Sequence, residues 1–272
     1  MPLTDYRTAL VTGASSGIGR ALSLRLAREG ARVSLVARRR DALEEVAEAA
    51  RAAGSEATVL ACDVGVNAQV AAAATAAQRA FGPVELLVNN AGYGRHRRFV
   101  DHELADIERM FRVNTLGSIA FAKALLPAMI ERRRGWIVFM ASVAGKIASP
   151  DESVYAATKF ALVGLAGALG LEVEEAGVHV LTVCPGVIDT PFFDEEALAR
   201  MSPTALRQRV EPEELVDAIL GALAKGRHEL TYPRAIAAGY LVQALAPGFM
   251  RRQVKRHTID AVARREREKP GS

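Results

Sequence analysis

Three side chains of complementary chemistry stand close together in the sequence: Ser142, Tyr155 and Lys159. Ser142 ends an apolar run, residues 136–141, that is typical of a buried strand. Tyr155 and Lys159 are four residues apart, so they project from one face if their segment is helical. A nearby cation favours the phenolate, and bringing a tyrosine pKa from about 10 to about 7 requires about 4 kcal/mol. The trio predicts a tyrosine that acts as a general acid or base, with a serine hydroxyl that bonds the substrate oxygen.

The same three residues also have a purely structural interpretation. Tyrosine and lysine four residues apart occur on many surface helices, and serine is common where a strand ends. The trio alone leaves both interpretations open, and the elements that position it have to decide between them.

A glycine-rich loop, from Thr12 to Gly19, follows the first apolar run of the chain, residues 8–11. A segment with helical periodicity comes next, and strand, glycine loop and helix together form the arrangement that binds a dinucleotide pyrophosphate. Gly13 would permit the tight turn, Gly17 would let backbone approach the phosphates, and Gly19 would let the helix pack on the strand. The spacing is not G-x-G-x-x-G, and a glycine loop alone is a weak signal.

The choice of cofactor depends on the end of the second predicted strand, residues 32–37. Many dinucleotide-binding folds place an acidic residue there, which binds ribose hydroxyls and repels a 2′-phosphate. This chain has Ala37 instead, followed by Arg38 and Arg39, which can make charge-assisted hydrogen bonds to that phosphate. The pattern favours NADP(H) over NAD(H), the alternative being that these arginines only begin a solvated helix.

Apolar strands alternate with helical segments along the rest of the chain. Further strands are predicted at residues 57–62, 84–88, 136–141, 178–183 and 229–232. Continuous apolar strands argue for an α/β fold, a doubly wound parallel sheet with helices on both faces. Ligands of such sheets bind beyond the carboxyl ends of the strands, which is where the polar motifs of this chain fall.

A long helical region, residues 101–132, carries Asn114 among apolar neighbours. A buried asparagine needs hydrogen-bond partners. Helices also contain purely structural asparagines, so the residue alone does not decide its role.

Composition and charge narrow the class of protein. The chain has 272 residues, half of them hydrophobic, which suits a single domain with a large core. Cys62 and Cys184 form neither a disulfide framework nor a metal-ligand pattern, so no metal site is expected. Basic clusters interleaved with aromatics are absent from the near-neutral body, which argues against nucleic acid. No targeting signal precedes the first strand, and stretches of low polarity fall short of the ~20 residues that span a bilayer, so a cytoplasmic protein is expected.

Jointly these motifs resemble the short-chain dehydrogenase/reductase family, in its shorter one-domain branch, over roughly residues 7–230. The shared motifs, in the family's order, are the glycine loop, Asp63, Asn89-Asn-Ala-Gly92, Ser142 with Tyr155 and Lys159, and Pro185-Gly186 with Thr190. The resemblance implies a Rossmann-like fold and an NAD(P)-dependent enzyme that interconverts a carbonyl and a secondary alcohol by hydride transfer.

The resemblance also implies a role for each catalytic residue. Tyr155 would be the acid/base, and Ser142 would orient the substrate oxygen. Lys159 would hold the nicotinamide ribose and lower the Tyr155 pKa, and Asn114 would anchor a water that relays protons through Lys159.

Residues near the strand ends would hold the cofactor, by the same resemblance. Asp63, with Val64 beside it, would bond the adenine amino group, residues 90–92 would line the adenosine ribose, and residues 185–190 would hold the nicotinamide. The full set is Gly13, Ser15, Ser16, Gly17, Ile18, Gly19, Arg38, Arg39, Asp63, Val64, Asn90, Ala91, Gly92, Tyr155, Lys159, Pro185, Gly186, Ile188 and Thr190.

Two features depart from the family's pattern. Ser142 stands in Met-Ala-Ser rather than the commoner Ile-Ser-Ser, which leaves the hydroxyl intact. The frequent final strand with Asp-Gly-Gly, which helps tetramers pack, is absent, so the resemblance favours a homodimer through the two long central helices. A family member that binds cofactor only as a sensor or partner protein is the alternative function, but such proteins usually lose one of the three catalytic residues.

The substrate and the C-terminal tail are less constrained. Phe192, Phe193 and Met201, in an irregular segment that is either a substrate lid or a solvent loop, suggest an apolar carbonyl or alcohol. We expect a catalytic domain at residues 1–232 and a tail at 233–272 that is apolar and then basic. The tail would pack as a helix over the body or bring weak contact with an anionic membrane surface.

Overall fold

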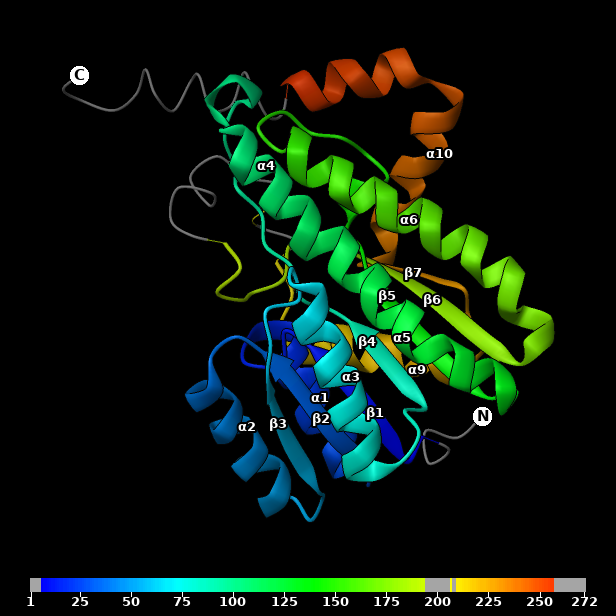
Figure 1. The fold of residues 1–272 in the computed structure, drawn as a ribbon. Coiled ribbons are helices and arrows are strands. Elements are labelled where there is room, and N and C mark those ends of the chain that lie inside the picture. The colour runs from blue at the N-terminus through cyan, green and yellow to red at the C-terminus, as the bar shows by residue number, and fades with distance from the viewer. Residues whose placement is uncertain (1–5, 194–205, 207–208, 257–272) are drawn as a thin grey trace.

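The computed structural model describes residues 6–193, 206 and 209–256 of the chain. These residues form one parallel sheet of seven strands, in the order β3-β2-β1-β4-β5-β6-β7 (Figure 1). The strands are β1 Thr8–Thr12, β2 Arg32–Ala37, β3 Ala57–Ala61, β4 Leu86–Asn89, β5 Gly135–Met140, β6 Val178–Pro185 and β7 Glu229–Tyr232. The chain runs outward from β1 to β3 and then returns to β4, so the strand order reverses between β1 and β4. A ligand cleft is expected at that reversal.

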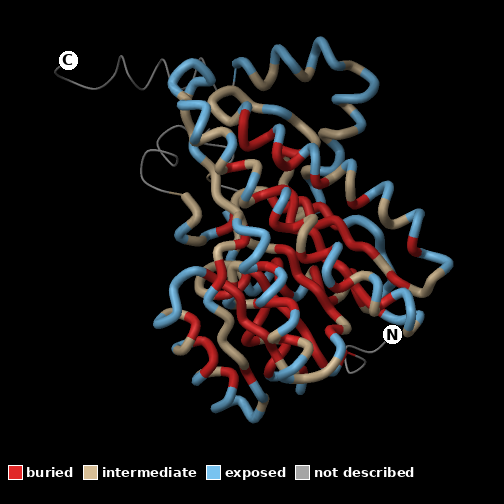
Figure 2. The backbone as a smooth tube through the Cα atoms, in the orientation of Figure 1, coloured by how far each residue is buried: buried red, intermediate tan, exposed pale blue. Residues whose placement is uncertain are grey.

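Helices cover both faces of the sheet, as the apolar strands predicted. One face packs on α1 (Gly17–Arg28), α2 (Arg40–Ala52) and α9 (Pro212–Ala224), and the other on α3 (Asn67–Phe81), α5 (Gly117–Glu131) and α6 (Ser153–Val173). Neighbouring residues of β5 serve opposite cores, because Val138 belongs to the first and Ile137 and Phe139 to the second. The buried residues concentrate in the sheet and the inner sides of these helices (Figure 2). The predicted α/β, Rossmann-like single domain is confirmed.

The long helical region predicted at residues 101–132 is interrupted in the structure. It consists of α4 (Leu104–Phe111), a π-helical turn (Arg112–Leu116) and α5, which continue one another. Asn114 lies in the π-helical turn and is fully buried. Helical periodicity in the sequence does not distinguish a π turn from an α turn.

Two helical stretches prove long and apolar enough to cross a membrane by length and composition, contrary to the expectation from the sequence. They are Leu104–Glu131, in which 50% of the most apolar window is buried, and Ser153–Ala176, in which 39% of that window is buried. Residues on their inner sides, such as Phe121 and Leu162, belong to the core between the sheet and helices α3, α5 and α6. Packing on a buried sheet therefore accounts for much of their apolar composition.

The C-terminal segment is helical and packs on the body. After β7 come a short 3-10 turn (Arg234–Ile236), α10 (Ala237–Leu245) and helical residues 247–256, orange to red at the top of Figure 1. The Thr231 hydroxyl in β7 donates a hydrogen bond to the Tyr240 hydroxyl of α10 at 3.3 Å. The Lys146 ammonium lies 5.6 Å from the centroid of the Tyr240 ring. Most of the suggested lid, including Met201, lies outside the described residues.

The Thr12 side chain ties the end of β1 to the loop that follows β4. Its hydroxyl oxygen accepts hydrogen bonds from the backbone N–H groups of Asn90 (2.9 Å) and Ala91 (3.0 Å), and it donates to the Val88 carbonyl at 3.3 Å. The Asn90 side chain returns a bond to the Thr12 carbonyl at 2.9 Å. These bonds fix the glycine loop against the 90–92 loop at the point where the strand order reverses.

We expect Thr12→Val to lower the free energy of unfolding by about 1–3 kcal/mol, because the two N–H groups lose their acceptor in a poorly hydrated place. Urea denaturation followed by circular dichroism measures the change. Thr75→Val is the matched control: Thr75 is exposed on α3, so its substitution should stay within about 0.5 kcal/mol. Equal stability of the two variants would show that the junction does not need the hydroxyl.

Candidate active site

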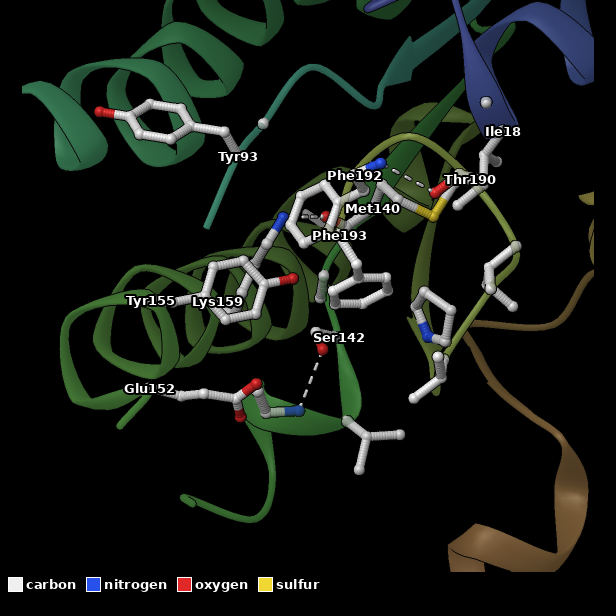
Figure 3. A pocket seen from close by; sticks show the side chains of 18 of the residues that line it. Ile18, Tyr93, Met140, Ser142, Glu152, Tyr155, Lys159, Thr190, Phe192 and Phe193 are labelled. Carbon is white, nitrogen blue, oxygen red and sulfur yellow. Dashed lines mark hydrogen bonds between the residues drawn. The ribbon is translucent and has the colours of Figure 1, made fainter. Parts of the chain in front are cut away.

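Ser142, Tyr155 and Lys159 lie together in one cleft. Ser142 follows β5, while Tyr155 and Lys159 lie on the first turns of α6, which packs beside the end of that strand (Figure 3). The Ser142 hydroxyl oxygen accepts a hydrogen bond from the backbone N–H of Ala144 at 3.1 Å. This bond fixes the oxygen and leaves the hydroxyl proton to be donated elsewhere.

Lys159 is buried, with 4% of its surface exposed. Its ammonium donates to the Met140 carbonyl at 2.8 Å and lies 5.6 Å from the centroid of the Tyr155 ring. Burial lowers the pKa of Lys159 to about 8. Near neutral pH the ammonium is therefore charged but easily deprotonated.

The environment of Tyr155 differs from the expectation that Lys159 lowers its pKa. Burial raises the pKa of Tyr155 above its ordinary value, the contact with the Ser142 hydroxyl lowers it only in part, and the negative charge of Glu152 raises it further. Desolvation of the phenolate thus outweighs the stabilising contacts within the protein. In this structure the protein's own groups keep the phenol protonated.

Asn114 uses its side chain to hold the loop that begins at Tyr93. Its amide nitrogen donates to the Tyr93 carbonyl (2.8 Å) and to the Thr158 hydroxyl (3.1 Å), and its amide oxygen accepts from the Tyr93 N–H at 2.9 Å. A Cβ at Gly92 would lie 3.2 Å from that amide oxygen and 3.5 Å from the Lys159 ammonium. These hydrogen bonds hold the loop next to Lys159. The role of Asn114 in a proton relay stays a prediction.

A cleft of about 970 Å³ runs along the carboxyl ends of the strands. Every residue predicted for the site lines it except Asn114, which lies behind the 92–94 loop, and Gly19, which packs inside the glycine loop. A side chain at Gly19 would collide with the Gly13 carbonyl, which is why the helix can approach the strand so closely. The residues that the motifs and the family resemblance predicted for the site therefore lie along one cleft, apart from these two.

The glycine loop leaves the start of α1 open to a ligand. Gly13 and Gly17 have φ angles of 67° and 52°, which favour glycine. Ser16, the residue before α1, makes no capping hydrogen bond with its side chain. The first N–H groups of α1 therefore remain available for an anion such as a pyrophosphate.

One end of the cleft is basic. Arg38 and Arg39 are exposed there, and Arg109 forms an ion pair with Asp63. Burial raises the pKa of Asp63, but the Gly65 N–H bond and Arg109 outweigh it, so the net pKa lies below its usual value. Asp63 stays ionised at neutral pH, and its interaction with Arg109 was not anticipated from the sequence.

At the opposite side of the glycine loop, residues 185–190 form the wall of the cleft. Ile188 pairs with Val210 in an isolated β-bridge, and Thr190 lies against Gly17. Gly186 lies against Ile236 of the C-terminal segment, so that segment contributes to the wall. The tail is thus part of the cleft rather than an appendage to it.

Several residues of the cleft belong to none of the motifs recognised in the sequence. His96 and Glu152 lie 2.7 Å apart at its far end, and Gly94 passes so close to Tyr155 that a Cβ there would lie 3.3 Å from its ring. Met250 and Val254 of the C-terminal segment also line this end. A glutamate three residues before Tyr155 was a visible signal, but its histidine partner is 56 residues away.

The family model for short chain dehydrogenases matches residues 7–200. The chain belongs to the short-chain dehydrogenase family. It is an NAD(P)-dependent short-chain dehydrogenase/reductase, as the motifs of the cleft predicted.

Several relatives of this short-chain dehydrogenase share similar sequence identity with it, between 30% and 35%. An uncharacterized oxidoreductase from Staphylococcus aureus is 34% identical, with 83% of this chain and 94% of the relative covered. The ketoacyl reductase HetN from a Nostoc species is 35% identical, with 80% and 75% covered. A dehydrogenase/reductase from Burkholderia phymatum in complex with NAD superposes with a TM-score of 0.81 at 30% identity (90% and 95% covered). One from Sphingobium yanoikuyae in complex with NADPH gives 0.78 at 31% (92% and 95%).

The residues present in this dehydrogenase fit a nicotinamide dinucleotide. The uncapped start of α1 suits the pyrophosphate, the ionised Asp63 suits an amino group, and the side-chain-free surface at Gly92 opens beside Lys159. The neighbours bind either NAD or NADP, so the class of cofactor is established and the choice between the two is not.

Proposed function

We propose that this protein is an NADP(H)-dependent oxidoreductase that interconverts a carbonyl and a secondary alcohol, with Tyr155 as acid/base. The observation that carries the proposal is the convergence of Ser142, Tyr155 and Lys159 in one cleft with the glycine loop. The alternative of a sensor without turnover has no support in this site, because none of the three groups is missing or turned away from the cleft (Figure 3).

In this mechanism each side chain has one task. Nicotinamide supplies or accepts the hydride when bound. Ser142, its oxygen fixed by Ala144, donates its proton to the substrate oxygen and orients it. Tyr155, whose raised pKa keeps the phenol protonated, delivers a proton to that oxygen when a carbonyl is reduced. Lys159 holds the ribose and, with a pKa near 8, can return a proton toward Tyr155, with Asn114 behind it as the proposed relay.

The preference for NADP(H) rests on charge at the end of β2. Ala37 stands where a carboxylate would repel a 2′-phosphate, and Arg38 and Arg39 line the cleft. Neither arginine has an ion-pair partner among the described residues, whereas Arg40 pairs with Glu44 at 3.6 Å. Two unpaired guanidinium groups beside the cleft suit a phosphate dianion.

An apolar substrate is supported by the far end of the cleft. The Phe192 ring lies 5.8 Å from that of Tyr155 and 4.9 Å from that of Phe193. Ile236, Met250 and Val254 of the C-terminal segment line the same end. The relative HetN is named a ketoacyl reductase, which agrees with a carbonyl group on an apolar body.

A homodimer through α5 and α6 is supported by the apolar surface that these helices leave uncovered. Ile130 of α5 and Phe160 and Leu171 of α6 are exposed, Leu171 by 79%. Less than half of the most apolar window of α6 is buried, and such a surface is typical of an interface between subunits.

We further propose a cytoplasmic catalytic domain, residues 1–232, whose C-terminal segment, 233–272, also touches anionic membrane surfaces weakly. Leu241, Leu245 and Phe249 are exposed on this segment, while its other side lines the cleft. Four exposed basic residues follow: Arg251, Arg252, Lys255 and Arg256. Exposed apolar side chains beside basic ones are typical of an interfacial helix.

The decisive experiment for the function is a panel of ketones with NADPH and of secondary alcohols with NADP+, followed by NADPH absorbance. Reduction of apolar ketones would support the proposal. Cofactor binding without turnover of any compound would instead favour the sensor.

Tyr155→Phe should reduce turnover at least ~100-fold, because the transferable proton is lost while shape and apolar volume remain. NADPH affinity, measured by fluorescence titration, should hardly change. Tyr232→Phe is the control, since that hydroxyl faces Glu214 outside the cleft. Near-normal turnover by the Tyr155 variant would refute its role.

Arg38→Ala should weaken NADP(H) binding about 10- to 100-fold, because a hydrogen bond to a charged group contributes about 1.5–3 kcal/mol. NAD(H) binding should hardly change. Arg40→Ala, which removes an arginine already paired with Glu44, should leave both cofactors unaffected. The assignment fails if both cofactors lose equally or if the wild type prefers NAD(H).

The full chain should sediment with anionic vesicles at low salt and dissociate at high salt, since each basic residue near the surface contributes about 1 kcal/mol. The double variant Leu245→Gln, Phe249→Gln keeps every charge and should bind measurably less. Uncharged vesicles provide the control. Absence of vesicle binding at low salt would leave the segment only its role in the cleft.

A further inference from the structure

His96 and Glu152 form a hydrogen-bonded pair at the substrate end of the cleft. The Nε2 of His96 lies 2.7 Å from Oε1 of Glu152, and their side chains are 6% and 21% exposed. An ionised carboxylate only accepts hydrogen bonds, so Nε2 carries the proton and donates it. The pair therefore fixes one oxygen of Glu152 and leaves the other without a partner among the described residues.

The backbone around Glu152 also fixes its position. Asp151 has a φ of 62°, in the left-handed region, and its carbonyl accepts from the Arg97 N–H at 2.9 Å. The Glu152 carbonyl accepts from the Ala156 N–H at 2.7 Å, which closes the first turn of α6. Glu152 is the residue directly before α6, and Tyr155 lies on the first turn of that helix. Its carboxylate is turned toward the space in front of Ser142 and Tyr155 (Figure 3).

The charge of this end is one-sided. Asp151 and Glu152 both line it. The arginines and lysines among the described lining residues, Arg38, Arg39, Arg109 and Lys159, lie on the other side of Tyr155. The Phe193 ring also lies at this end, 5.7 Å from the ring of His96. A ligand that displaces water here has to give the free oxygen of Glu152 a donor, because an unpaired buried carboxylate is costly.

We propose that Glu152, held by His96, determines specificity by accepting a hydrogen bond from a hydroxyl group next to the reacting carbon, and that the substrate is an apolar hydroxy-ketone or the matching diol. This inference rests on the proposed function of the cleft. A carboxylate at the same position of a substrate is rejected, because it meets the like charge of Glu152 and has no proton to donate to it. The pair is not part of the proton transfer itself.

Three matched compounds test the inference: 2-octanone, 1-hydroxy-2-octanone and 2-oxooctanoate. They share the chain and the ketone and differ only in the group beside it. Their affinities are measured by calorimetry on the full-length protein saturated with NADP+, where a ketone cannot be reduced. Turnover of the same compounds with NADPH is measured separately.

The wild type should bind the hydroxy-ketone about 10- to 100-fold more tightly than 2-octanone, and the oxoacid most weakly. Glu152→Leu removes the acceptor, so the preference should fall to about one. Glu152→Gln keeps the shape and the bond from His96 but removes the charge, so the oxoacid should gain about 10-fold. Comparing ratios cancels any effect of these variants on Tyr155. Glu103→Leu and Glu103→Gln, at the exposed start of α4 outside the cleft, should leave all ratios unchanged.

Equal or absent binding of the three compounds by the wild type would overturn the inference, and so would an unchanged preference in Glu152→Leu. The latter result would mean that the pair only ties the 93–98 loop to α6. Turnover without a binding preference supports the proposed function and overturns the inference. A binding preference without turnover supports the site and overturns the proposed function.

Discussion

The hydrogen bond from the Lys159 ammonium to the Met140 carbonyl sets the geometry on which the site depends. It joins α6 to the end of β5, so it fixes Tyr155, one turn before Lys159, relative to Ser142, two residues after Met140. A buried ammonium with one carbonyl partner is unfavourable for stability, and its pKa of about 8 is the sign of that cost. The rest of the fold has to stabilise this arrangement, which holds a charged group ready beside the cleft.

Much of that stabilisation comes from the loop after β4, whose backbone is held in place by buried side chains. Thr12 fixes the 90–92 loop to β1, and Asn114 fixes Tyr93 on both its N–H and its carbonyl. A Cβ would be tightly placed at Gly92, 3.2 Å from the Asn114 amide oxygen, and at Gly94, 3.3 Å from the Tyr155 ring. The Thr12 and Asn114 side chains therefore bond this loop to the body at several of its backbone groups, which restricts its freedom.

Sequence patterns predicted the elements well because strands buried on both faces are continuously apolar. β2 and β7 begin and end where expected, whereas β4 and β6 differ by a few residues, since periodicity does not mark where a ladder stops. The sequence also predicted residues that line the cleft, because their types and short spacings can be recognised locally. These are the glycine loop, Ser142, and Tyr155 with Lys159. Pairings between distant residues could not be predicted: His96 with Glu152, Asp63 with Arg109, and Gly186 with Ile236. The raised pKa of Tyr155 was missed for the same reason, because it depends on burial, which is a property of the assembled fold.

Charge is distributed along the cleft so that its two ends suit different ligands. Arg38, Arg39 and Arg109 line the end at β2, whereas Asp151 and Glu152 line the end beyond Tyr155. Interactions inside a cleft are screened less than those on an open surface, so this polarity acts on any ligand that enters. This distribution suits a dinucleotide whose phosphates lie toward the first end. In the proposal above, the second end binds a neutral, hydroxyl-bearing substrate, so one distribution of charge would serve both cofactor orientation and substrate choice.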